Sequence, residues 1–125
     1  MINLRPVDYL TVAKFFVDFQ KHSKNFELPS DEAQIVGIFN QDSLIGYYII
    51  QGYDNKDVEI IQGYLIPSSR HANLPIECMR LLEQSCKKAG YSRMMLATGS
   101  RFRAYLKFAK GLGYKPTHLE FSKEL

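Results

Sequence analysis

One stretch of the sequence, residues 57–90, constrains the fold more than any other. Its first part is a continuous apolar, β-branched run from Val58 to Ile66, which predicts a strand covered on both faces. Pro67 ends that strand, because proline has no N–H to donate to a neighbouring strand. After a short loop, Pro75 stands where the first turn of a helix tolerates proline. The stretch therefore predicts a strand, a tight loop and a helix in succession.

The helix predicted after Pro75 ends at Gly90. Lys87 and Lys88 fall in its last turn, where the helix dipole favours positive charge, and Gly90 can take the left-handed conformation that ends many helices. A strand that enters a helix through a tight loop is a common phosphate site, because bare backbone N–H groups point outward there. Apolar residues recur at helical spacing at Ile76, Cys78, Met79, Leu81, Leu82, Cys86 and Ala89.

The flanking segments supply the remaining elements. The first strand ends at Pro6, and Asp8 caps the first helix. The order is β-α-β-β-β-α-β-α-β, an α/β fold with a mixed sheet, in which antiparallel hairpins precede a right-handed β-α-β crossover. We expect one domain spanning residues 1–125. The other expected strands are 2–5, 35–39, 44–50, 92–98 and 118–122, the other helices are 9–22 and 101–111, and the apolar face of the first helix is Leu10, Val12 or Ala13, Phe16, Val17 and Phe19.

Composition excludes several classes of function. With 46% hydrophobic and 23% charged residues, the chain has the composition of a soluble globular protein, and no apolar run reaches membrane length. The net charge of +3 permits an anionic ligand without indicating nucleic acid. Cys78 and Cys86 lie two turns apart on one helix, which predicts reduced thiols and a cytoplasmic setting. The two cysteines and three scattered histidines do not match the spacing of metal ligands.

Three motifs along nearly the whole chain point to one family. They are the entry at residues 2–6, the hairpin at residues 37–47, and Leu-Ile-Pro-x-x-Arg at residues 65–70, which stands at a fixed distance from Gly90. Residues 108–114 then read Phe-Ala-Lys-Gly-Leu-Gly-Tyr. In this order and spacing the motifs resemble the GNAT N-acetyltransferase superfamily.

The resemblance implies an N-acetyltransferase that uses acetyl-CoA. In that family the strand before the loop parts from its neighbour, and its exposed backbone binds the pantetheine arm. The N–H groups of the loop then hold the pyrophosphate, which requires small residues so that the backbone can approach. The acetyl-CoA contacts implied for this chain are Tyr64, Leu65, Ile66, Arg70, His71, Ala72, Asn73, Leu74 and Ile76.

The phosphate loop departs from the family pattern, which makes it a degenerate version. The two small residues of the family fall on Asn73 and Pro75, so the loop contains no glycine. Pro75 removes one N–H, whereas asparagine tolerates a left-handed conformation. Each lost charge-assisted bond to phosphate costs about 1.5–3 kcal/mol. Arg70 and His71 can supply side-chain donors in compensation; the alternative is that the loop is only a connector.

The resemblance also suggests catalytic groups. Glu59 stands where some family members place the carboxylate that deprotonates the amine, directly or through water; the alternative is an edge carboxylate exposed to solvent. Many members protonate the departing thiolate with a tyrosine, whose position here holds Ala109. Tyr105, one turn earlier, either substitutes for it or belongs to the core.

The acceptor and the partners stay open. The chain lacks the length for the family's second helix and for its last strand, so the acceptor side is either open or completed by another chain, which includes a homo-oligomer. The acceptor is then an amine on a small molecule or a protein; neither nucleic acid nor membrane is expected. The alternative function is a catalytically inactive GNAT-fold binding or structural protein, similar to small phage-encoded and virion-associated members, with or without CoA binding.

Overall fold

The computed structural model describes residues 1–22, 32–96, 110–115 and 123–124. Within them the sheet has the strand order β1-β2-β3-β4-β5, in which only β4 and β5 pair in parallel. Residues 110–111 are helical, and the rest of the predicted last helix and the strand at 118–122 lie outside the described residues. The elements are β1 (Ile2–Val7), α1 (Tyr9–His22), β2 (Gln34–Asn40), β3 (Ser43–Gly52), β4 (Asp57–Leu65), a 3₁₀ turn (Pro67–Ser69), α2 (Leu74–Lys88) and β5 (Arg93–Leu96).

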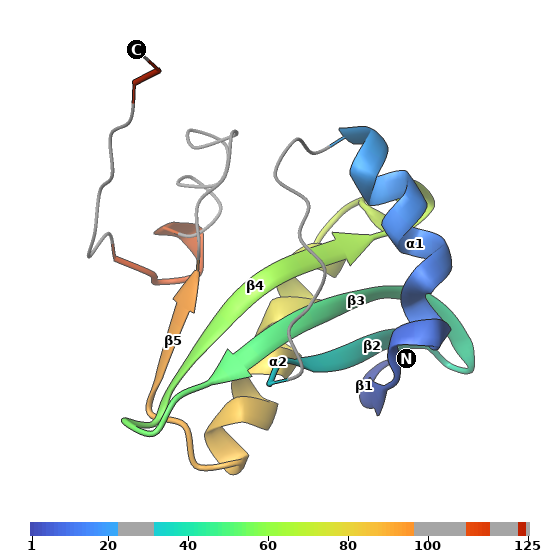
Figure 1. Cartoon of the computed structure of the whole chain (residues 1–125). Coiled ribbons are helices and arrows are strands. Elements are labelled where there is room, and N and C mark those ends of the chain that lie inside the picture. Colours follow the sequence, from blue (N-terminus) through green and yellow to red (C-terminus); the bar gives the residue numbers. More distant parts are fainter. Residues whose placement is uncertain (23–31, 97–109, 116–122, 125) are drawn as a thin grey trace.

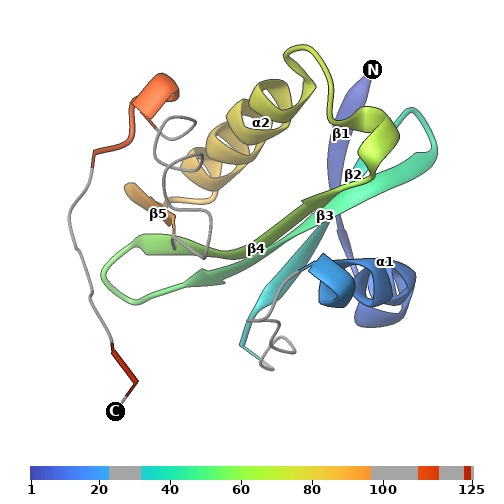
Figure 2. The ribbon, with the colours of Figure 1, turned by 90° about the horizontal axis from the view of Figure 1, so that it is seen from above.

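The two helices cover opposite faces of the sheet, as Figure 2 shows. Each face carries its own apolar cluster, and β4 contributes to both. This explains why the sequence of β4 is apolar almost throughout. The cluster under α1 consists of Val12, Phe15, Phe16, Tyr47, Ile49 and Tyr64; the cluster under α2 includes Ile38, Ile50, Val58, Ile60, Met79, Leu82 and Cys86.

The prediction that Pro6 ends the first strand is wrong, because β1 continues to Val7 and Pro6 pairs with Val36. The N–H of Gln41 donates to the carbonyl of Met1 at 2.9 Å. Hydrogen-bonded and non-bonded pairs alternate from there along an antiparallel ladder, so Pro6 falls on a non-bonded pair. Its missing N–H therefore faces the open edge of the sheet, where proline is tolerated.

The predicted apolar face of α1 is wrong at two positions. Leu10 and Val17 are 81% and 58% exposed, whereas Phe15, which the prediction omitted, is 8% exposed. The buried stripe runs through Val12, Phe15 and Phe16, because α1 presents this side to the aromatic residues of β3 and β4. The predicted cap is confirmed, since Asp8 Oδ1 accepts the backbone N–H of Thr11 at 2.9 Å.

A β-bulge in β4 marks the point where the described pairing with β5 stops. Ile50 pairs with Ile60 and Ile49 with Gln62, so Ile61 is an extra residue without a partner in β3. A bulge bends its strand and increases the local twist. Among the described residues, which stop at Leu96 in this part of the chain, the parallel pairing covers β4 as far as Ile60. Figure 1 shows β4 and β5 starting together and then diverging.

An ion pair joins β4 and β5 at the closed end of this opening. The Arg93 guanidinium donates to both carboxylate oxygens of Asp57, with Nη2 at 2.6 Å and Nε at 3.2 Å. Asp57 is 7% exposed and also accepts a hydrogen bond from the Asn55 side chain. The bonds from Arg93 hold the pKa of Asp57 below its usual value, which keeps the pair ionised.

Candidate functional site

The backbone of β4 after the bulge offers hydrogen-bonding groups on the side of the opening. The N–H of Ile66 donates to the carbonyl of Ile45 at 2.9 Å. Because bonded pairs alternate along an antiparallel ladder, Tyr64 also turns its backbone groups to β3, whereas Gly63 and Leu65 turn theirs away from β3. The N–H of Ile66 is thus engaged within the sheet, whereas the N–H of Leu65 faces the opening.

Some backbone N–H groups of the loop from β4 to α2 make hydrogen bonds within the loop itself. Ser69 and Arg70 donate to the carbonyls of Ile66 and Pro67 in the 3₁₀ turn, and Leu74 donates to His71 at 3.2 Å. Pro75 has no N–H, and Glu77 makes the first regular bond of α2, to Asn73. Within the described part of the chain, the backbone N–H groups that find no acceptor in this corner are those of Ser68, His71, Ala72, Asn73 and Ile76.

The left-handed residue of the loop is Ala72, with φ at +51°. Asn73, which the sequence indicated as the residue suited to this conformation, instead has φ −97° and ψ 9°. Placing alanine in the left-handed region costs roughly 1 kcal/mol. The loop thus makes the turn that glycine makes without strain, one residue earlier than the family spacing implies.

Arg70 lies back over the end of β4 rather than extending from the loop. Its Nε donates to the carbonyl of Leu65, and its guanidinium carbon lies 5.1 Å from the centre of the Tyr64 ring. The Tyr64 hydroxyl in turn donates to Oδ2 of Asp18 on α1. Burial and the Asp18 carboxylate raise the pKa of Tyr64, so the hydroxyl stays protonated and remains a donor.

Glu59 lies in the part of β4 that pairs with β5, opposite Met95. Its neighbours Val58 and Ile60 belong to the cluster under α2. Because successive side chains of a strand point to opposite faces, the half-buried side chain of Glu59 lies on the α1 side of the sheet. The Tyr53 hydroxyl donates to Glu59 Oε1 at 3.1 Å, which raises the pKa of Tyr53. A carboxylate that holds a single described hydrogen bond keeps acceptor capacity for another proton donor.

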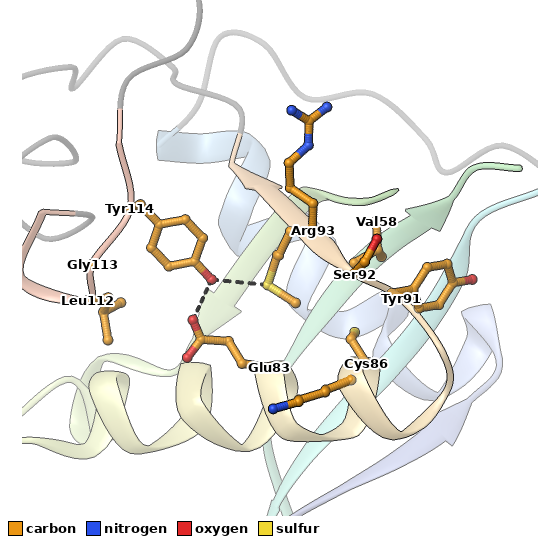
Figure 3. Close-up of a pocket in the computed structure, with 11 residues that line it drawn as sticks. Val58, Glu83, Cys86, Tyr91, Ser92, Arg93, Leu112, Gly113 and Tyr114 are labelled. Carbon is orange, nitrogen blue, oxygen red and sulfur yellow. Dashed lines mark hydrogen bonds between the residues drawn. The ribbon is translucent and has the colours of Figure 1, made fainter. Parts of the chain in front are cut away.

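A cavity of about 620 Å³ lies between the second half of α2, β5 and residues 112–114. The Tyr114 hydroxyl lies 2.7 Å from Glu83 Oε2 and 3.2 Å from Met94 Sδ. Figure 3 shows this hydroxyl turned toward Glu83, while the Arg93 guanidinium points away from it. None of the predicted site residues lines this cavity, and it lies at the end of α2 remote from the phosphate loop. Tyr105 lies outside the described residues.

Sequence reasoning missed the polar contacts buried under α1. Besides the bond from Tyr64 to Asp18, Gln62 donates to the hydroxyl of Tyr47, and both residues are buried. Gln62 was the available signal, because a glutamine inside an apolar run needs a buried partner.

Three general expectations can be compared with the described residues. Cys78 and Cys86 are free and buried, as predicted, and burial raises the pKa of Cys78 to about 11. Within these residues no three His, Cys, Asp or Glu side chains gather as a metal site would require. The same part of the chain contains no helix of the length and apolar character needed to span a bilayer.

Comparison with known proteins rests on structure. No family model and no curated protein matches the sequence. YycN of Bacillus subtilis, which carries a provisional assignment as an acetyltransferase, superposes with a TM-score of 0.80 at 15% identity, over 100% of this chain and 99% of that one. AAC(6')-Iy, solved with the bisubstrate analogue CoA-S-monomethyl-acetylneamine, matches with 0.68 at 13% identity, over 100% and 99%.

A ribosomal-protein-alanine N-acetyltransferase of Brucella melitensis gives a TM-score of 0.72 at 11% identity, over 100% of this chain and 99% of that one. These matches span the whole length of proteins that share the mixed sheet and its crossover. The chain therefore has the fold of the GNAT acyltransferases.

Proposed function

We propose that this protein is an acetyl-CoA-dependent N-acetyltransferase. The observation that carries the proposal is that, among the described residues, β4 pairs with β5 only up to Ile60, while the backbone groups of Gly63 and Leu65 face away from β3. This edge leads directly into a loop with several N–H groups that find no acceptor among the described residues. An extended thioester arm fits such an edge, and a diphosphate fits such a loop. The CoA portion of the analogue bound to AAC(6')-Iy supports the same assignment of ligand.

In the proposed reaction, an amine attacks the thioester carbonyl of acetyl-CoA. A C–N bond forms, the C–S bond breaks, and the oxyanion between these events is stabilised by the N–H of Leu65. Glu59, directly or through water, takes the proton that the ammonium must lose before it can attack. Tyr105 is the proposed donor of the proton that the departing thiolate takes up. The acceptor is an amine on a small molecule or a protein.

Binding of acetyl-CoA is tested by thermal unfolding of the full chain. Ligand at about 100 times its dissociation constant adds about 2.7 kcal/mol to stability, which corresponds to a rise in Tm of roughly 10 °C for a domain of this size. We expect a smaller rise with acetyl-pantetheine, which lacks the diphosphate. If millimolar acetyl-CoA leaves Tm unchanged, the transferase assignment is wrong.

Catalysis is tested separately by release of free CoA thiol across a panel of amines. Glu59→Gln keeps the size of the side chain and its bond to Tyr53 but removes the base. We expect it to leave acetyl-CoA binding within about twofold and to lower kcat by about 10²–10⁴. The pH dependence of kcat should lose its acidic limb in this variant. Tight binding without thiol release from any amine would instead indicate a CoA-binding protein without turnover.

A further inference from the structure

We propose that Asp18 on α1 is a positioning residue for Arg70. It acts through the Tyr64 ring and fixes the guanidinium so that its remaining N–H groups meet the diphosphate of a CoA-type ligand. The inference rests on the proposed function and adds to it a residue far from the loop in sequence. Asp18 and Arg70 belong to different elements, and Tyr64 connects them.

The Tyr64 ring is held from two directions. It is 9% exposed, and its ring centre lies 5.3 Å from that of Phe15 and 5.7 Å from that of Tyr47. Its hydroxyl donates to Asp18 Oδ2. Packing sets the plane of the ring, and the carboxylate sets the position of its hydroxyl end. An aromatic ring fixed in this way is a defined surface on which a cation can rest.

Arg70 uses that surface and one backbone group. Its guanidinium lies over the Tyr64 ring, and its Nε–H is taken by the carbonyl of Leu65. Arginine carries five N–H donors in a rigid fork, so fixing Nε also fixes the direction of both Nη groups. The residue is exposed. Its guanidinium also interacts with the Tyr64 side chain, and beyond Tyr64 and the Leu65 carbonyl the described part of the chain shows no further acceptor for it.

The composition of the loop explains why such a device is needed here. Pro75 offers no N–H, and the N–H groups of Arg70 and Leu74 are used within the loop. The backbone therefore grips an anion less completely than a glycine-rich loop does. A guanidinium matches phosphate with paired hydrogen bonds, and one that is already oriented loses less conformational freedom on binding.

A purely structural role for Asp18 makes a different prediction. If the bond to Tyr64 only fastened α1 to the sheet, replacing Asp18 would weaken every ligand equally and would do so with or without Arg70. If Asp18 acts through Arg70, its replacement affects only ligands that carry the diphosphate and has no effect once Arg70 is absent. A double-mutant cycle separates the two roles.

The experiment measures affinity for acetyl-CoA by calorimetry and for acetyl-pantetheine by NMR titration. The variants are Asp18→Asn, Tyr64→Phe, Arg70→Ala and the double variant of Asp18 and Arg70. Asp8→Asn is the matched control, because the Asp8 carboxylate, at the other end of α1, also accepts a hydrogen bond from a side-chain hydroxyl, that of Thr11 at 2.6 Å. Tyr64→Phe keeps the ring and removes only the hydroxyl, so it serves even if Asp18→Asn folds poorly.

We expect Asp18→Asn and Tyr64→Phe each to weaken acetyl-CoA binding about 5- to 20-fold and acetyl-pantetheine binding less than twofold. In the Arg70→Ala background, the effect of Asp18→Asn on acetyl-CoA should fall below twofold, and Asp8→Asn should change neither affinity. Equal weakening of both ligands, or an undiminished effect of Asp18→Asn without Arg70, overturns the positioning role.

A measurement on the unliganded chain tests the positioning independently of acetyl-CoA. Hydrogen exchange of the Arg70 Nε–H should be at least tenfold slower than that of a solvated arginine, and Asp18→Asn should remove this protection. Fast exchange in the unaltered chain overturns the positioning role even if acetyl-CoA binds. Slow, Asp18-dependent exchange in a chain that binds no acetyl-CoA supports the positioning and removes the proposed function.

Discussion

Replacing Gly46 by alanine should disturb the position of the Leu65 amide. Gly46 pairs with Leu65, and a Cβ added at Gly46 would lie 2.2 Å from the carbonyl oxygen of Tyr64 and 3.0 Å from Cα of Leu65. The obstacle is backbone, so it cannot rotate away as a flexible side chain would. The strands must separate by about 0.8 Å merely to reach the shortest contacts that real structures show.

The cost can be worked out from the contacts involved. Overpacking in a buried site costs about 1–3 kcal/mol, and loss of the bond from Ile66 to Ile45 adds about 1 kcal/mol. We therefore expect Gly46→Ala to lower the free energy of unfolding by about 2–4 kcal/mol, measured by urea denaturation. Where the chain still folds, acetyl-CoA binding should weaken, because the Leu65 amide turns with the strand.

Gly111→Ala is the matched control for this substitution. No atom of the described residues lies within 4 Å of a Cβ added at Gly111, so the change should stay within about 0.5 kcal/mol of the unaltered chain. If Gly46→Ala were equally neutral in urea, the close approach of β3 to β4 at Leu65 would not constrain the fold, and the reasoning would be wrong.

Further substitutions test other parts of the structure. Ala72→Gly should raise stability by about 0.5–1 kcal/mol in thermal unfolding, because glycine relieves the positive φ; a loss of stability would contradict the left-handed assignment. Arg93 holds the pKa of Asp57 below its unfolded value, so the stability that Asp57 contributes is present above about pH 4 and is lost as pH falls through the folded pKa. Asp57→Asn should therefore reduce the loss of stability at acidic pH in unfolding scans from pH 7 to pH 2. If the loss is unchanged in this variant, the ion pair is not its source. Leu82→Ala should lower the free energy of unfolding by about 2–5 kcal/mol. Leu10 is 81% exposed, so Leu10→Ala should change the free energy of unfolding by no more than about 0.5 kcal/mol. Equal effects of the two variants in urea denaturation would refute the assignment of the core.

The sequence was most informative where one local rule decides the structure. The apolar run before Pro67 predicted β4, whose observed bounds, Asp57–Leu65, differ by one residue at each end. Pro75, the two lysines of the last turn and Gly90 predicted α2, and Gly90 does take a positive φ of +100°. In each case a proline, a glycine or a helical repeat acts within a few residues, so no tertiary contact was needed to interpret it.

The errors arose where tertiary contacts decide. Pro6 looked like a strand end because the sequence does not show that β1 lies at the sheet edge. Leu10 and Val17 looked like core because their spacing also fits a helical stripe, and only packing against β3 and β4 selects the stripe with Phe15.

In the candidate site, too, the features set by local sequence were predicted and those set by tertiary contacts were not. The loop and Arg70 were predicted from motif spacing, but no local pattern indicates that Arg70 turns back onto Tyr64 or that Tyr64 reaches Asp18, 46 residues away. The bulge at Ile61 also escaped prediction, because neither glycine nor proline marks it. Ala72 took the left-handed position in place of Asn73, since the geometry of the whole loop outweighs the preference of one residue.

The unpaired residue at Ile61 reverses the parity of β4. Before it, odd-numbered side chains such as that of Glu59 lie on the α1 side; after it, even-numbered ones such as that of Tyr64 do. The side chains of Glu59, the proposed base, and Tyr64, on which Arg70 rests, therefore lie on the same side of the sheet although the two residues are five positions apart. A regular strand with the same five-residue spacing would place them on opposite sides, so the bulge at Ile61, and not only the composition of β4, is part of the site.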